Sequence, residues 1–245
     1  MMIEAMRRAR VGSVGADTPE RVCADLPGGM LAGISGLPGL HLMGCDLDDG
    51  VALPLVAARA ALSPGELARA GRFLRPLDAG RFMRGRLFLR CALGAWLGAA
   101  PQDVALTEEK GGKPVLAGRA RGPWFNLSHA GPCMVLALSE TAPVGIDLEA
   151  HERSACMVDL AAAFLSAREV ADWGRRADAD TLLRAWTAKE AALKLSGTGL
   201  ARDPRDIDLV WRDGGPVAVP ALGAALLPIP VGGHVCTLAV PEQAR

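Results

Sequence analysis

The alternation of apolar and polar residues predicts short strands and amphipathic helices along most of the chain. A first strand is expected at residues 40–47, where apolar side chains recur with the two-residue period of a strand. Ser63 forms a capping-box pattern with Glu66, so a helix is expected to begin there. A longer helix is expected over residues 81–97, with Asp78 as its N-cap.

The second half of the chain shows similar signals for the starts of helices and strands. Ser166 and Glu169 form another capping-box pattern. A helix is expected from about residue 182 to residue 196, capped by either Asp178 or Asp180. Further strands are expected at residues 101–106, 113–116, 124–127, 134–138, 144–149, 204–210 and 235–240.

The two halves repeat one another at a fixed distance. Four pairs share an offset of 103 residues: Ser63 and Ser166, Pro101 and Pro204, Gly111 and Gly214, and Cys133 and Cys236. A shared offset predicts an internal duplication. We therefore expect an α+β fold of two similar subdomains related by a pseudo-two-fold axis, each a small antiparallel sheet with packed helices. The expected boundaries are an arm of undecided order at 1–38, an N-terminal subdomain at 39–142 and a C-terminal subdomain at 143–245.

The composition of the chain argues against several classes of function. Lys and Arg together number 27, as do Asp and Glu, so no charge excess favours nucleic acid or an acidic membrane as a partner. No apolar run reaches the roughly 18–20 residues of a membrane span. The N-terminus lacks the apolar region of a secretory signal. The 6 cysteines form no C-x-x-C pair, which is typical of reduced thiols in a cytoplasmic protein.

Two acidic residues stand out in the segment Val144–Glu149 (VGIDLE). In a strand, Asp147 and Glu149 point to the same face, about 6.5–7 Å apart, while Ile146 and Leu148 point into a core. Adjacent carboxylates repel, and a hard divalent cation between them would relieve the repulsion. The alternative is an edge strand with a solvated acidic face.

A second polar stretch lies in the helix of the second half. Trp186, Glu190 and Lys194 are spaced four residues apart and share one face, whereas Lys189 is rotated away from it. The alternative is an ordinary surface ion pair, although a tryptophan on the same stripe indicates that this face is packed. With Asp147 and Glu149, Glu190 makes three carboxylates, which supply oxygens of the kind Mg²⁺ prefers.

These two motifs resemble the signature pair of the 4'-phosphopantetheinyl transferases, G-[IV]-D-[IVL]-E followed about forty residues later by W-[ST]-x-K-E-[AS]-x-x-K. Two further family motifs are present at Gly112–Pro114 (GKP) and Phe125–His129 (FNLSH). The length and the duplication resemble the longer, Sfp-type class, which folds as a pseudo-dimer within one chain. The resemblance runs from about residue 40 to residue 240.

The resemblance implies a reaction. Family members transfer the 4'-phosphopantetheine arm of coenzyme A to a serine of an apo carrier protein and release adenosine 3',5'-bisphosphate. It implies that Asp147, Glu149 and Glu190 hold Mg²⁺, with Mn²⁺ as a substitute. Glu190 would act as the base for the carrier serine and Lys194 would contact the pyrophosphate of coenzyme A.

The resemblance also implies residues that contact the nucleotide part of coenzyme A. These are Arg69, Arg81, Lys113, Ser128 and His129, in addition to Lys194. Each has an alternative interpretation: Lys113 as a turn lysine, His129 as a loop histidine, and the two arginines as solvated helix faces.

The expected partners are coenzyme A and apo acyl or peptidyl carrier domains of polyketide, non-ribosomal peptide or fatty acid synthesis. We expect a monomer. Three competing hypotheses remain: a carrier-binding module without catalysis, an unrelated Mg²⁺-dependent phosphotransferase, and a purely structural α+β protein. An unrelated phosphotransferase would require a Walker-type G-x-x-x-x-G-K-[ST] loop, and this sequence has none.

Overall fold

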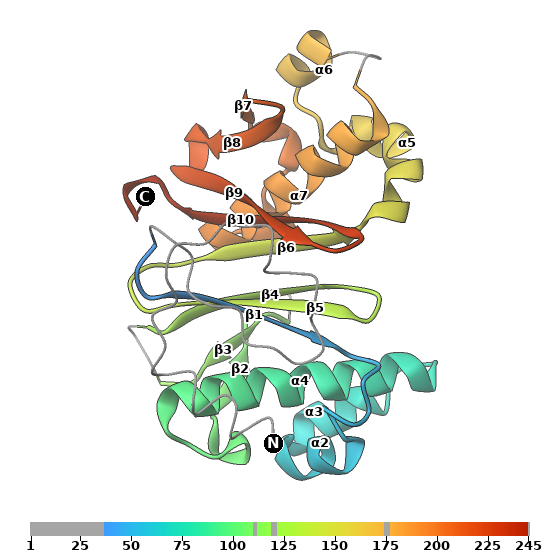
Figure 1. The fold of residues 1–245 in the computed structure, drawn as a ribbon, viewed down its shortest axis with the longest axis vertical. Helices are drawn as coiled ribbons and strands as arrows, with labels where there is room; N and C mark the ends of the chain where they lie inside the picture. The colour runs from blue at the N-terminus through green and yellow to red at the C-terminus, as the bar shows by residue number, and fades with distance from the viewer. Residues whose placement is uncertain (1–36, 110–111, 119–121, 174–176, 245) are drawn as a thin grey trace.

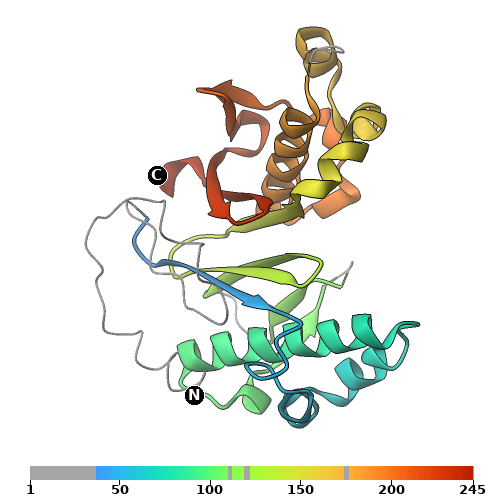
Figure 2. The same ribbon diagram turned by 45° about the vertical axis from the view of Figure 1, so that its right-hand side comes forward.

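The computed structural model describes residues 37–109, 112–118, 122–173 and 177–244 as a stack of four layers (Figure 1). Two antiparallel sheets lie face to face in the middle, the long helix α4 covers the outer side of one, and α7 covers the outer side of the other. Figure 2, turned by 45°, shows the same order of layers. The predicted α+β class with small antiparallel sheets is confirmed.

The described residues of the first half form three helices and two small sheets. The helices are α2 (Leu55–Ala61), α3 (Pro64–Ala70) and α4 (Pro76–Leu97). The strands are β1 (Leu40–Asp46), β2 (Leu106–Glu108), β3 (Pro114–Leu116), β4 (Trp124–Ala130) and β5 (Cys133–Ser139). The order β1-β5-β4 forms one sheet, and β2 pairs with β3 in a separate hairpin.

The second half contributes three helices and a five-stranded sheet. The helices are α5 (Ser154–Phe164), α6 (Ala167–Trp173) and α7 (Ala179–Ser196). The strands are β6 (Gly145–Ala150), β7 (Val210–Arg212), β8 (Gly215–Val219), β9 (Ala224–Val231) and β10 (His234–Pro241), in the order β6-β10-β9-β8-β7.

The repeat seen in the sequence recurs in these elements. Helix α3 begins at residue 64 and α6 at residue 167, which is the offset of 103. Helix α4 begins at residue 76 and α7 at residue 179, again 103 positions later. The capping boxes at Ser63 and Ser166 both form, since each hydroxyl accepts from the backbone N–H three residues on. The two halves therefore have the same succession of elements.

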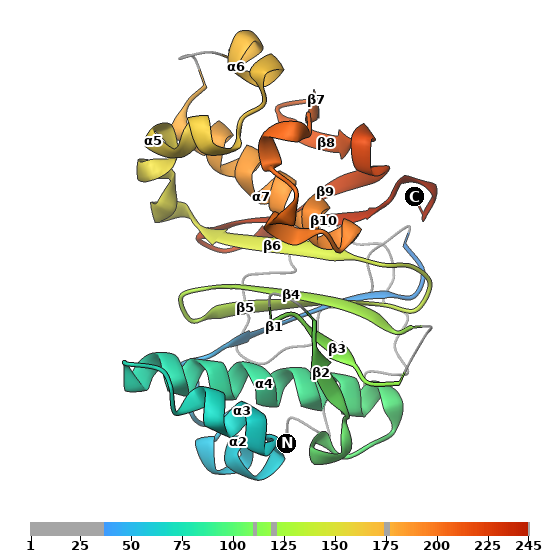
Figure 3. The ribbon, with the colours of Figure 1, turned by 180° about the vertical axis from the view of Figure 1, so that it is seen from behind.

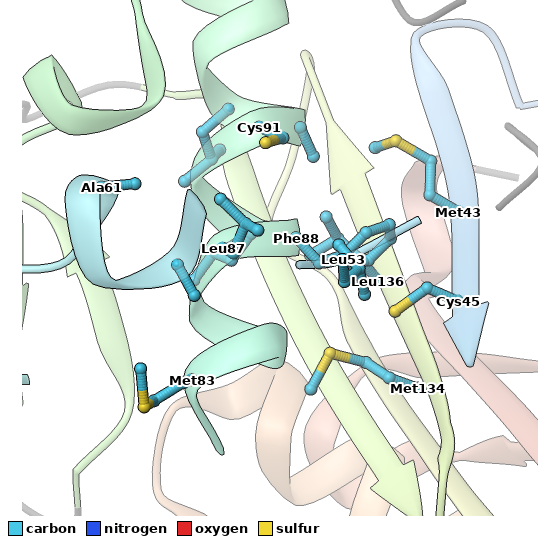
Figure 4. Packing of buried hydrophobic residues seen from close by; sticks show 14 of the residues in the cluster. Met43, Cys45, Leu53, Ala61, Met83, Leu87, Phe88, Cys91, Met134 and Leu136 are labelled. Atoms are coloured by element: carbon cyan, nitrogen blue, oxygen red, sulfur yellow. The ribbon is translucent and has the colours of Figure 1, made fainter. Parts of the chain in front are cut away.

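Three hydrophobic clusters hold the layers together. One packs α4 against the first sheet, and Figure 4 shows Phe88 and Cys91 of α4 in the same cluster as Met43 and Cys45 of β1. A second packs α7 against the second sheet. The third lies between the two sheets and includes Ile146 and Leu148 of β6. The two sheets are thus covered on both faces.

Three predicted details are wrong. Residues 101–103 and 204–206 form 3₁₀ turns rather than strand, and the adjoining strands begin at Leu106 and Val210. The physical reason is the proline at the first position of each turn, which suits a helical start and removes a donor from a strand. The helix expected at 81–97 begins at Pro76 with Arg75 as its N-cap, so Asp78 lies in its first turn.

Asp178 rather than Asp180 caps α7, because its carboxylate accepts from the Thr181 N–H at 2.7 Å. The helix ends at Gly197, whose φ of 73° is left-handed. Within the described part of the chain, every helix is too short or too polar to cross a bilayer. The expected arm at 1–38 falls almost wholly outside the described residues.

Candidate functional site

The site lies where α7 rests on strand β6, on the outer face of the second sheet (Figure 3). A glycine permits the close approach of the two elements. A Cβ atom at Gly145 would stand 2.1 Å from the carbonyl oxygen of Ala191 and 2.5 Å from the backbone nitrogen of Leu195. The first residue of the G-x-D-x-E motif therefore has a packing role, because a side chain there would force the helix away from the strand.

Asp147 is buried beneath the end of α7. Its Oδ1 accepts hydrogen bonds from Lys194 Nζ at 2.7 Å and from Ser128 Oγ at 3.0 Å. Its Oδ2 is buried and has no hydrogen-bond partner. Lys194 Nζ also reaches the carbonyl oxygen of Ile146 at 3.2 Å. Asp147 and Lys194 thus form a partly buried ion pair with one carboxylate oxygen unsatisfied.

Glu149 lies two residues along the same face of β6. Trp186 Nε1 donates to its Oε1 at 3.0 Å, and Arg153 Nη1 donates at 2.8 Å. The Arg153 guanidinium also lies over the Trp186 ring, 5.9 Å from its centroid. The tryptophan of the helical stripe therefore fixes the outer carboxylate, as Lys194 fixes the inner one.

Glu190 sits between these two pairs on α7. Its Oε1 is buried without a hydrogen-bond partner. Burial raises the pKa of Glu190, and the negative charge of Asp147 raises it further, with Lys194 acting in the opposite direction. A half-buried carboxylate with a raised pKa is suited to accept and hold a proton. The structure thus gathers the predicted residues of both motifs on one face.

The carboxylate oxygens of this face fit a hard cation in part. Asp147 Oδ2 and Glu190 Oε1 are two buried carboxylate oxygens without donors, which is the unsatisfied negative charge that Mg²⁺ would neutralise. In the part of the chain that the structure describes, no three acidic, histidine or cysteine side chains are gathered as a complete metal-ligand set. Glu149 would have to exchange Arg153 or Trp186 for the ion.

Two side chains of β4 connect the halves at this point. Asn126 Oδ1 accepts from the Ile146 N–H at 2.9 Å, and Ser128 Oγ accepts from the Leu148 N–H at 3.2 Å. Both side chains are buried. Ser128 therefore holds the strand that carries the acids, and its hydroxyl touches Asp147 directly. Sequence reasoning missed Asn126, although its place two residues before Ser128 in the FNLSH motif was a usable signal.

A pocket of about 570 Å³ opens in the first half, beside α4 and β4. The predicted residues Arg69, Arg81 and His129 line it, together with Phe82 and Arg86. His129 follows Ser128 on β4 and faces the opposite side of the strand. Burial lowers the pKa of His129, and the positive charges of Lys194 and Arg81 lower it further. The pocket and the acidic face are therefore electrostatically coupled through His129.

The arginines of the pocket are held in place by acids. Arg81 makes a two-pronged ion pair with Asp48, with Nε–Oδ1 at 2.9 Å and Nη2–Oδ2 at 2.6 Å. Arg69 Nη1 donates to Glu108 at 2.7 Å and stacks over the Phe82 ring. Such pairing fixes the position of both guanidinium groups. Lys113 lies between two residues that line the pocket, Gly112 and Pro114.

Comparison with known proteins agrees with this arrangement. A family model described as 4'-phosphopantetheinyl transferase superfamily matches residues 143–238, and one described as 4'-phosphopantetheinyl transferase, N-terminal, matches residues 53–141. This chain belongs to the 4'-phosphopantetheinyl transferase superfamily. Its two halves correspond to the two family models.

Several curated superfamily members are similar to the chain. The 4'-phosphopantetheinyl transferase HetI of Nostoc sp. is 40% identical over 148 residues, covering 58% of this chain and 62% of the relative. A putative 4'-phosphopantetheinyl transferase of Synechocystis sp. is 37% identical over 153 residues, covering 60% and 62%. A 4'-phosphopantetheinyl transferase of Bacillus subtilis is 28% identical over 163 residues, covering 65% and 71%. The chain thus spans 62% of the length of each of the first two relatives.

Proposed function

We propose that this protein transfers the 4'-phosphopantetheine arm of coenzyme A to a serine of an apo carrier protein. The observation that carries the proposal is the convergence of Asp147, Glu149, Glu190 and Lys194 on one face between β6 and α7. Membership of the superfamily supports it, and the curated relatives bear the name of this activity.

In the proposed reaction, the carrier serine oxygen forms a bond to the β-phosphorus of coenzyme A. The bond from that phosphorus to the bridging pyrophosphate oxygen breaks, and adenosine 3',5'-bisphosphate leaves. The serine proton passes to Glu190, directly or through a water molecule. Lys194 supplies positive charge beside the leaving oxygen.

A divalent cation completes the proposed site. Asp147, Glu149 and Glu190 are the residues that would hold Mg²⁺, or Mn²⁺ in its place, and the ion would neutralise charge on the pyrophosphate. The two buried oxygens without donors, on Asp147 and Glu190, support this part of the proposal.

We assign the nucleotide part of coenzyme A to the pocket of the first half. Arg69, Arg81 and His129 line this pocket and would contact the phosphates, with Lys113 at its rim. Guanidinium groups suit phosphate oxygens because they donate two parallel hydrogen bonds. Ser128 was expected to contact the nucleotide, but its hydroxyl is engaged by Asp147, Leu148 and Lys194. Its proposed role is therefore to position Asp147.

The test is to incubate the protein with coenzyme A, Mg²⁺ and an apo carrier, and to measure the carrier by mass spectrometry. One carrier each from polyketide, non-ribosomal peptide and fatty acid synthesis should be included. We expect at least one carrier to gain the mass of the phosphopantetheine arm. Binding of a carrier without any mass gain would instead indicate a carrier-binding module and overturn the proposal.

A further inference from the structure

Lys189, the residue before Glu190, is fully buried. Its exposed fraction is 0%, and its Nζ lies 2.6 Å from Glu169 Oε2. Three carbonyl oxygens also surround this ammonium group, those of Phe164 at 2.8 Å, Pro204 at 2.9 Å and Ile207 at 2.9 Å. A buried charge persists only when it is paired and hydrogen-bonded, because its desolvation is costly. The sequence pattern placed Lys189 off the polar stripe but did not predict this enclosure.

The acceptors of Lys189 come from three separate segments. Phe164 ends α5, and Glu169 belongs to the capping box that begins α6. Pro204 begins the 3₁₀ turn that precedes β7. Glu169 is itself held on its other oxygen by the Leu209 N–H at 3.0 Å. One side chain of α7 thus ties this helix to its surroundings on the side away from β6.

The anchor lies about 100° around the helix from Glu190, because successive helical residues differ by that angle. On the opposite side, Gly145 allows backbone contact between α7 and β6. On that side α7 is tied to β6 by Lys194, which donates to Asp147, and by Trp186, which donates to Glu149. Lys189 attaches the helix on the other side, so the rotation of α7 is fixed from both sides.

The first half contains a similar buried cation, which is paired with the glutamate of the other capping box, but it lacks the acidic face. Arg90 of α4 donates to Glu66 Oε2 from Nη2 at 2.6 Å and from Nε at 3.2 Å. Its Nη1 reaches the carbonyl oxygens of Pro101 at 3.2 Å and Val104 at 2.8 Å. These acceptors stand 103 residues before Glu169, Pro204 and Ile207. Arg90 is therefore a matched control for the structural part of the role of Lys189.

We propose that Lys189 is a positioning residue for phosphopantetheinyl transfer: it holds α7 at the rotation that aims Glu190 and Lys194 at Asp147. The inference rests on the proposed function for its kinetic consequence. Its structural consequence, the orientation of the stripe that begins at Trp186, is independent of any activity.

The test uses two matched pairs of substitutions in the full chain. One combines Lys189→Met with Glu169→Gln, because glutamine retains the capping box and no buried carboxylate is left unpaired. The control combines Arg90→Met with Glu66→Gln. Folding is checked by circular dichroism, and all readouts are normalised to folded protein. Lys189→Arg, which keeps the charge, is measured beside them.

Two quantities are measured on each variant. The first is the indole N–H resonance of Trp186, assigned with Trp186→Phe, since this N–H donates to Glu149. The second is kcat at saturating coenzyme A. We expect the 169/189 pair to shift the Trp186 resonance and to lower kcat on the order of 100-fold, the effect of about 1 Å of misplacement. The 66/90 pair should leave both unchanged, and Lys189→Arg should restore part of kcat.

An unshifted Trp186 resonance with wild-type kcat in the folded 169/189 pair would overturn the inference, and so would an equal loss in the 66/90 pair. If the 169/189 pair does not fold, the folded Lys189→Arg variant decides: a shifted Trp186 resonance with a partial loss of kcat supports the inference, and an unshifted resonance contradicts it. Absence of turnover in the wild type would overturn the proposed function, while the Trp186 resonance would still test the positioning.

Discussion

A long helix covers the outer side of a sheet in each half, but the two helices differ in chemistry. In the first half, α4 carries Met83, Leu87 and Cys91, which are all nearly inaccessible to solvent and belong to the hydrophobic cluster of that half. The residues 103 positions later are Trp186, Glu190 and Lys194. The strands match as well: Cys45 pairs with Met134, and Asp147 pairs with Thr237, which stands 103 residues after Met134. Glu190, Lys194 and Asp147 of the candidate site thus have apolar counterparts in the first half, which are Leu87, Cys91 and Cys45 (Figure 4).

The order of helices and strands is the same in both halves, whereas the residues at matching positions of the long helix differ. One succession of elements accepts either apolar residues or a set of charged residues at these positions. The first choice buries apolar area, which stabilises the fold. The second leaves two carboxylate oxygens buried without hydrogen-bond donors, which costs stability. In the proposed function these oxygens would hold a divalent cation.

The largest expected effect concerns activity. Replacing Glu190 by glutamine removes the proposed base, so kcat should fall by roughly 10²–10⁴-fold. Folding should be retained, because the change removes a repelled charge from a buried position. The assay is transfer of the phosphopantetheine arm to an apo carrier, with stability measured by urea unfolding. Turnover at the wild-type level in this variant would remove Glu190 from the mechanism.

The reciprocal change tests the first half. Leu87→Glu places a charge where Glu190 has its counterpart, but the surroundings of Leu87 are apolar. We expect the free energy of unfolding to fall by about 3–5 kcal/mol, the cost of an uncompensated buried charge. Leu87→Met conserves volume and should cost less than about 1.5 kcal/mol. Similar urea midpoints for the two variants would show that the first-half face is as tolerant of charge as the second.

A smaller effect is expected at the glycine of the site. Gly145→Ala brings a methyl group against the backbone of α7, so we expect a loss of about 1–3 kcal/mol, as in other overpacked contacts. Turnover should fall as well, since the helix carrying Glu190 must move. Gly215→Ala is the matched control, because a Cβ there meets no atom within 4 Å. Equal stabilities of the two variants would contradict the close packing of α7 on β6.

The smallest expected effect is a difference in pH dependence between Glu66 and Glu190. Burial alone would raise the pKa of Glu66, but hydrogen bonds from Arg90 and Ser63 outweigh it and lower the pKa below its ordinary value of about 4.5. The stabilising contribution of Glu66 is therefore present above that pH and is lost as the pH falls through the folded-state value.

Glu190 has a raised pKa, so its contribution to stability changes with pH in the opposite direction. Its favourable contribution is present below about pH 4.5 and is lost as the pH rises through its folded-state pKa. Compared with wild type, Glu66→Gln should lose more stability as the pH increases, whereas Glu190→Gln should gain. Urea unfolding between pH 3 and pH 7 in the presence of a chelator measures both slopes. Slopes of the same sign would contradict the electrostatic difference between the halves.

Local chemistry made much of the fold predictable. Both capping boxes formed as expected, and the offset of 103 residues between the halves recurred in their helices. Short-range patterns failed at residues 101–106 and 204–210, where apolar composition favoured strand but proline at the first position favoured a 3₁₀ turn. Helix α5 was not predicted, because its exposed apolar residues blur the period.

The sequence by itself determined which side chains share a face, because the periods of a strand and a helix are set by the backbone. It therefore placed Asp147 with Glu149, and Trp186 with Glu190 and Lys194. Only the tertiary structure decided what those faces meet. Three contacts depend on residues 19 to 37 positions apart: Ser128 with Asp147, Trp186 with Glu149, and Lys189 with Glu169. No local period encodes such distances, since they are set by how the packed layers bring separate segments together.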